Sequence, residues 1–138
     1  MTQIRPNIKT GNWKLSKHEF YTAYHYSLQY HEWEDKCRGI VGISALNMDG
    51  MPRGSTTSNP TERQGIAISE YQHKMYIIEQ TIKETDEQLY PWLLKAVTCE
   101  DITYNYLKQV MNIPCGKNIY YDRRRKFYYL LSQKLNTN

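Results

Sequence analysis

The positive charge of this chain is concentrated in its last quarter. Between residues 112 and 138, one acidic residue, Asp122, stands among six basic residues. The six bases are Lys117, Arg123, Arg124, Arg125, Lys126 and Lys134. Since the whole chain has 18 bases and 14 acids, residues 1–111 hold the other 12 bases and 13 acids. A basic segment on a nearly neutral body is typical of a polyanion-binding face.

The spacing of the apolar residues predicts that this basic segment forms one helix from Lys117 to about Leu135. On a helical projection, the predicted buried face consists of Tyr120, Phe127, Leu130 and Leu131, with Leu135 at its edge. The opposite face carries Asn118, Tyr121, Asp122, Arg125 and Tyr129. Arg125 is therefore predicted to point squarely outward, and the neighbouring bases to lie on the flanks of the helix.

The residues before this helix predict how it is presented to a partner. Residues 101–111 are predicted to form a short helix capped by Asp101, and residues 112–116 a tight turn. Short helix, turn and basic helix is the order of a helix-turn-helix unit, whose second helix reads the major groove with its first turns. The candidate base-reading residues are Asn118, Tyr121, Asp122 and Arg125. The candidate phosphate-binding residues are Lys117, Arg123, Arg124 and Lys126. The alternative is a merely solvated basic run, but its place in the second helix favours nucleic-acid binding.

Helix signals also divide the rest of the chain. Ser16 and Glu19 form a capping box, which predicts a helix from Lys17 to about Cys37 with Gly39 as its stop. Residues 39–58 are rich in glycine and proline and are predicted to be a long loop. A second helix is predicted from the Asn59-Pro60-Thr61-Glu62 start to about Thr85, and a third over residues 86–97.

An apolar stripe follows the second predicted helix at steps of three and four residues. Its members are Ile68, Tyr71, Met75, Ile78 and Ile82. Two heptads are too few to distinguish a dimer seam from packing inside the monomer, although internal packing is favoured.

Taken together, these signals predict an all-α fold, a helical bundle with a C-terminal helix-turn-helix. Residues 1–15 are expected to be a flexible arm. Residues 16–58 would hold the first helix and the loop, and residues 59–138 the long helix and the DNA-binding unit. The apolar content is a modest 40%, and this fraction includes thirteen amphipathic tyrosines.

Other chemistry is weakly supported. No pair among the four histidines completes a zinc site, and Cys37, Cys99 and Cys115 are interpreted as reduced, partly buried thiols. The cluster Glu32, Glu34 and Asp35 is interpreted as a solvated acidic face. The sequence contains none of the glycine-rich phosphate loops or nucleophile motifs of common enzymes. We therefore expect no enzymatic activity, no catalytic residue, no metal and no cofactor.

The sequence also lacks the signals of a membrane or secreted protein. No run approaches the roughly 20 apolar residues of a membrane helix. The N-terminus has no apolar stretch of the signal-peptide type. A cytoplasmic location without membrane contact is therefore expected.

Two stretches resemble a group of short phage and prophage proteins of Gram-positive bacteria. They are residues 49–64, DGMPRGSTTSNPTERQ, and residues 90–135, which contain YPWLLKAV and the run YYDRRRKF. In the order of their elements they are similar to late-gene transcriptional regulators of the ArpU and RinA type, whose DNA-binding end looks like region 4 of a sigma factor. The resemblance covers roughly residues 40–135. The turn with Pro114 and the tyrosine-rich helix before it depart from that pattern.

The resemblance implies a transcriptional regulator that acts in a bacterial host cell. The expected partners are double-stranded DNA and host RNA polymerase, and the apolar stripe of the second predicted helix adds a second copy of the chain as a candidate partner. The predicted loop is interpreted as a flexible tether; as an alternative, its Arg53 is a candidate contact to DNA or polymerase. Two alternatives stay open. One is another phage DNA-binding role, such as a small terminase subunit. The other is a protein-binding inhibitor or adaptor that acts on a host nuclease or on RNA polymerase.

Overall fold

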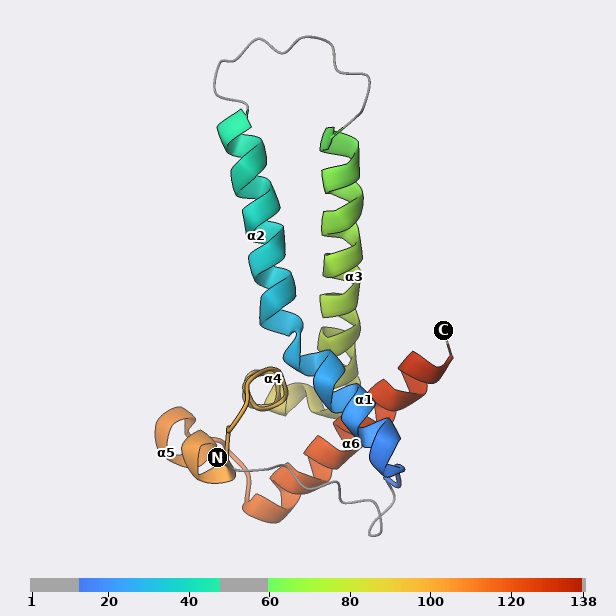
Figure 1. Ribbon diagram of the computed structural model, residues 1–138. Helices are drawn as coiled ribbons and strands as arrows, with labels where there is room; N and C mark the ends of the chain where they lie inside the picture. The colour runs from blue at the N-terminus through green and yellow to red at the C-terminus, as the bar shows by residue number, and fades with distance from the viewer. Residues whose placement is uncertain (1–12, 48–59, 138) are drawn as a thin grey trace.

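The computed structural model describes residues 13–47 and 60–137, and in these ranges all regular structure is helical. The elements are α1 (Lys17–Leu28), α2 (Tyr30–Asn47), α3 (Pro60–Asp86), the 3-10 turn η1 (Glu87–Leu89), α4 (Tyr90–Thr98), α5 (Tyr104–Met111) and α6 (Lys117–Asn136). The predicted all-α class is confirmed for this part of the chain. Helices α2 and α3 run side by side as a long hairpin that stands on a base of α1, α4, α5 and α6 (Figure 1). Among the described helices, none is both long and apolar enough to cross a bilayer.

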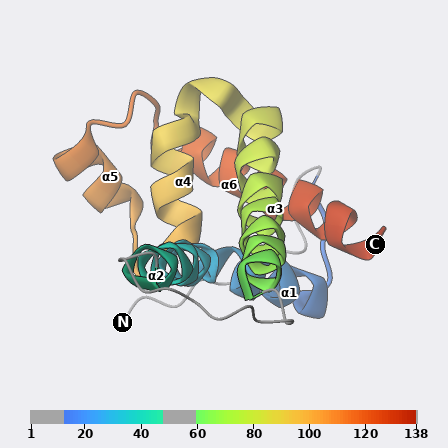
Figure 2. The same ribbon diagram turned by 90° about the horizontal axis from the view of Figure 1, so that it is seen from above.

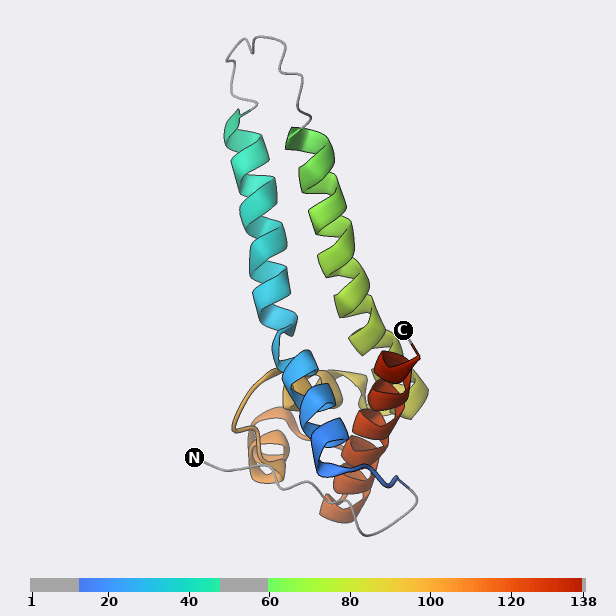
Figure 3. The ribbon, with the colours of Figure 1, turned by 45° about the vertical axis from the view of Figure 1, so that its right-hand side comes forward.

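The helix predicted from Lys17 to Cys37 is two helices. Its start is as predicted, because the Ser16 hydroxyl accepts from the Glu19 amide at 3.1 Å and Glu19 accepts from the Ser16 amide at 3.0 Å. At Gln29 the backbone amide bonds three residues back, to the Tyr26 carbonyl at 3.2 Å, and α1 ends. The bend is explained by packing, since α1 contacts α4 and α6 whereas α2 contacts α3. Figure 3 shows the change of direction between α1 and α2.

The predicted stop at Gly39 is wrong, because α2 continues to Asn47. A Cβ at Gly39 would meet no atom within 4 Å, so this glycine lies at an open helix position. A glycine inside a helix costs only about 1 kcal/mol, which packing of α2 along α3 outweighs. The predicted loop therefore cannot begin before residue 48. Residues 48–59, with Arg53 and the expected cap Asn59, lie outside the described residues.

Helix α3 agrees with its prediction to within one residue at its C-terminal end. Its stripe faces α2 within the same chain: Ile78 and Ile82 are fully buried, and Tyr71 and Met75 pack against the core. The Tyr30 hydroxyl of α2 donates to the Glu79 carboxylate of α3 at 2.6 Å. The favoured prediction of internal packing is therefore confirmed for these positions.

The chain enters α5 later than predicted. Asp101 has a left-handed backbone, with φ of 61°, and is therefore no helix cap. Thr103 caps α5 instead, and its hydroxyl accepts from the Tyr106 amide at 3.1 Å. Because a left-handed residue cannot belong to a right-handed helix or serve as an extended cap, the start of α5 lies beyond Asp101, at Tyr104.

The core lies where α6 crosses α1 and α3 (Figure 2). On α6 the predicted buried residues Tyr120, Phe127 and Leu131 are buried, whereas Leu130 is only half-buried. Tyr128, which the helical projection did not include in the buried face, is also buried. The reason is that α6 packs against two helices at once, so its buried arc is wider than the single face of the projection.

Candidate nucleic-acid interface

The turn between α5 and α6 is fixed to two helices. Asn112 ends α5 in a left-handed conformation, with φ of 53°, and the next amide, of Ile113, bonds the Leu107 carbonyl at 3.1 Å. Within the turn, the Cys115 carbonyl accepts from the Tyr104 hydroxyl at 2.7 Å. The Trp92 indole of α4 donates to the Met111 carbonyl, also at 2.7 Å. These bonds hold the start of α6 against α4 and α5.

Helix α6 begins without a side-chain cap. Gly116 occupies the cap position in extended conformation, and its carbonyl accepts from the Tyr120 amide at 3.0 Å, but it has no side chain to cap the first-turn amides. The first residues of α6, Lys117 and Asn118, are both exposed. The first-turn amides and the positive end of the helix dipole are therefore accessible beside a lysine, which is a suitable arrangement for a phosphate.

Arg123 is occupied by carboxylates of the same chain. Its Nε donates to the Asp86 carboxylate at 3.1 Å, and its Nη1 donates to the Asp122 carboxylate at 2.6 Å. The first contact ties α6 to the end of α3. The second contact neutralises the charge of Asp122, whose carboxylate was predicted to accept a hydrogen bond from a DNA base. Both side chains are already paired within the protein.

Arg124 lies over tyrosine rings rather than on an open flank. Its guanidinium carbon is 4.9 Å from the centroid of the Tyr121 ring and 5.9 Å from that of Tyr120. Burial raises the pKa of Tyr120 and of Tyr128, and the nearby positive charge of Arg124 opposes both increases. Arg124 therefore provides positive charge next to a buried group of tyrosines.

Arg125 is half-buried, so the prediction that it points squarely outward is wrong. Its Nε is inaccessible and has no hydrogen-bond partner among the described residues. The projection failed here because it assigned the whole side opposite Phe127 to solvent. A buried guanidinium nitrogen without a partner is costly, and an anion at the outer guanidinium nitrogens would offset part of that cost.

The segment before α1 covers part of the outer face of α6. The Trp13 ring lies 5.5 Å from the Tyr129 ring, and Lys126 Nζ lies 5.6 Å from the Trp13 centroid. Leu15 also packs against the core. The predicted flexible arm therefore does not extend to residues 13–15, and residues 1–12 lie outside the described residues. The sequence signal for this contact was the aromatic Trp13 in a mostly polar N-terminal segment.

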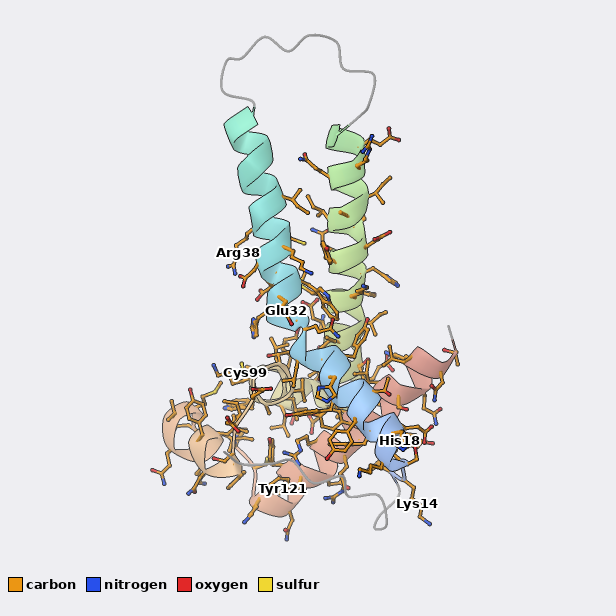
Figure 4. The ribbon with its side chains drawn as sticks, in the orientation of Figure 1. Lys14, His18, Glu32, Arg38, Cys99 and Tyr121 are labelled. Atoms are coloured by element: carbon orange, nitrogen blue, oxygen red, sulfur yellow. The ribbon has the colours of Figure 1, made fainter. Side chains whose placement is uncertain are left out.

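The predicted site residues thus fall into two groups. Lys117 and Asn118 are exposed, and Arg125 is half-buried. The others have partners within the chain, namely Tyr121, Asp122, Arg123, Arg124 and Lys126. Figure 4 shows Tyr121 on the underside of α6, and Lys14 projecting from the base below α1.

Fold and interface together define an all-helical protein with a basic, uncapped helix start. Comparison of the chain with protein-family models, curated proteins and solved structures finds no match.

Proposed function

We propose that the chain binds double-stranded DNA through the unit formed by α5, residues 112–116 and α6. The observation that supports this most is the exposed first turn of α6, where Lys117 and Asn118 follow an uncapped Gly116. Exposed Lys108 on α5 adds a second positive charge on the neighbouring helix. The order of the helices is that of a helix-turn-helix, and the resemblance to phage late-gene regulators makes transcriptional control the proposed role.

Fewer residues are proposed to contact DNA than the sequence alone implied. The first-turn amides and Lys117 would bind a phosphate, and Asn118 and Tyr121 would approach base edges. Arg125 would place its outer guanidinium nitrogens on the DNA backbone. Arg123 and Arg124 would position α6 from within the protein. RNA polymerase remains a proposed partner because of the resemblance, and a homodimer remains a proposed state of the chain.

The test compares two single-charge changes by fluorescence anisotropy on a labelled random duplex at several salt concentrations. Lys117→Gln should weaken binding and reduce the salt slope by about one unit, because one phosphate contact is lost. Arg63→Gln is the matched control, since Arg63 is exposed on α3 within the hairpin. Salt-independent binding, or equal losses in both variants, would refute the proposal.

A second candidate function is supported by exposed apolar residues on the same unit. Tyr106 and Val110 lie one turn apart on α5, and Val110 is 60% exposed. Ile119, in the first turn of α6, is 50% exposed. Such residues favour a protein partner, as in an inhibitor or adaptor of a host nuclease or polymerase. In that case Val110→Ser would abolish capture of the purified partner, and duplex DNA would not bind. A small terminase subunit would instead show a ring-sized mass in light scattering.

A further inference from the structure

Three reactive side chains meet where the end of α4 reaches the first turn of α2. Cys99 follows α4, and its Sγ lies 3.6 Å from Nε2 of His31. The other ring nitrogen of His31, Nδ1, lies 2.7 Å from the Glu34 carboxylate. Figure 4 shows Cys99 beneath the lower end of α2, on the part of the base that α5 adjoins. Thiol, imidazole and carboxylate in this order are the groups that activate a cysteine nucleophile.

His31 lies between the other two groups. Its Nδ1 faces the Glu34 carboxylate, and its Nε2 faces both the Cys99 sulfur and the Thr98 hydroxyl, the latter at 3.1 Å. The Thr98 hydroxyl donates to the Leu94 carbonyl at 2.6 Å. The carboxylate therefore orients the imidazole with Nε2 toward the thiol.

Nε2 of His31 is placed to accept the thiol proton of Cys99 as the sulfur attacks. The thiolate formed in this way is the nucleophilic form of cysteine. Cys99 is half-buried and His31 is 50% exposed at its side chain, so a small molecule can reach the sulfur.

The other two cysteines lack this environment. Cys37 has only a long contact, 4.0 Å from its sulfur to the Ile68 carbonyl. Burial raises the pKa of the Cys115 thiol, which lowers its thiolate fraction. Cys37 and Cys115 can therefore serve as internal controls for the reactivity of Cys99.

We propose that Cys99 is a modification site that reacts with small-molecule disulfides. The Cys99 thiolate attacks one sulfur of the disulfide, the S–S bond of the reagent breaks, and a mixed disulfide forms on Cys99. The departing thiolate takes up the proton that His31 holds. No oxidant other than the disulfide is needed. The added group would displace His31 from Thr98 and so loosen the contact between α2 and α4.

The experiment treats the full chain with oxidised glutathione, stops the reaction with acid and measures each cysteine by peptide mass spectrometry. Cys99 should be modified about tenfold faster than Cys37 or Cys115, because His31 Nε2 is placed to take its thiol proton as the sulfur attacks. His31→Asn and Glu34→Gln should each slow Cys99 several-fold. His18→Asn, a change at an exposed histidine of α1, should leave the rate unchanged.

Circular dichroism of each variant separates chemistry from unfolding. Glu34→Gln keeps the size and shape of the side chain. This variant therefore still tests the proposal if the His31→Asn variant unfolds. The proposal fails if Cys99 reacts no faster than the other two cysteines. It also fails if a folded Glu34→Gln or His31→Asn variant reacts as fast as the unaltered chain.

Discussion

At the scale of single residues, the basic run from Arg123 to Lys126 consists of side chains with different surroundings. The sequence assigned Arg123 and Arg124 to phosphates by their position on the helix. In the structure Arg123 is paired with Asp86, and Arg124 lies over tyrosine rings. Consecutive charges on a helix point in directions about 100° apart, so each meets a different neighbour.

The pair formed by Arg123 and Asp86 provides a stability test. Arg123→Ala should lower the free energy of unfolding by about 1 kcal/mol, since the pair is partly exposed. Asp86→Ala should cost about 1 kcal/mol more, because Asp86 also accepts from the Gln88 amide and caps η1. Urea unfolding of both single variants and the double variant gives the coupling energy. A coupling near zero would show that the ion pair does not hold α6 on α3.

At the scale of elements, the left-handed Asn112 decides the direction in which α6 leaves α5. Most residues pay a steric penalty in this conformation, whereas glycine does not and asparagine pays less. The bonds from Tyr104 and Trp92 then hold the neighbouring carbonyls. The presentation of Lys117 and Asn118 therefore depends on the Asn112 backbone together with these two bonds.

Substitution at Asn112 separates its backbone conformation from its side chain. Asn112→Ala should lower the free energy of unfolding by about 1 kcal/mol, and Asn112→Gly should leave it nearly unchanged. Asn105→Ala, at an exposed helical position of α5, is the control and should change it very little. Thermal and urea unfolding followed by circular dichroism measure the three variants. Equal losses for Ala and Gly would mean that the side chain, and not the backbone, matters at residue 112.

At the scale of the whole molecule, buried tyrosines from several helices share one electrostatic property. Burial raises the pKa of Tyr26 to about 12 from its ordinary 10.0. Burial likewise raises the pKa of Tyr30, and the hydrogen bond to Glu79 adds to this increase. The pKa values of further tyrosines are also raised, namely Tyr24, Tyr90, Tyr120 and Tyr128. The folded chain therefore keeps tyrosine protons that the unfolded chain loses.

This difference predicts alkaline unfolding. Because the folded pKa values lie above the unfolded value, the stabilisation is complete below about pH 10 and is lost as the pH rises toward 12. Tyr26→Phe should make the decline between pH 10 and 12 less steep. Tyr76→Phe, at a tyrosine that is 54% exposed, should not change it. Urea unfolding at a series of pH values measures the free energy of unfolding of both variants. A steeper or unchanged decline of this free energy for Tyr26→Phe would contradict the prediction.

The sequence by itself determined the helical class and the starts of α1, α3 and α6. The capping box at Ser16, the proline at residue 60 and the glycine at residue 116 act through hydrogen bonds and backbone preferences within a few residues. Such local interactions can be recognised in a short window of sequence. The periodic stripes of α3 and α6 were predictable for the same reason.

Only the tertiary structure decided which side chains are available for chemistry. The bend at Gln29, the continuation of α2 past Gly39 and the wide buried arc of α6 depend on which helices pack together. The contact of Arg123 with Asp86 joins residues that are 37 positions apart in the sequence. The contact of Cys99 with His31 joins residues that are 68 positions apart. No local pattern encodes such pairs, because they arise from packing between helices and not from preferences within one.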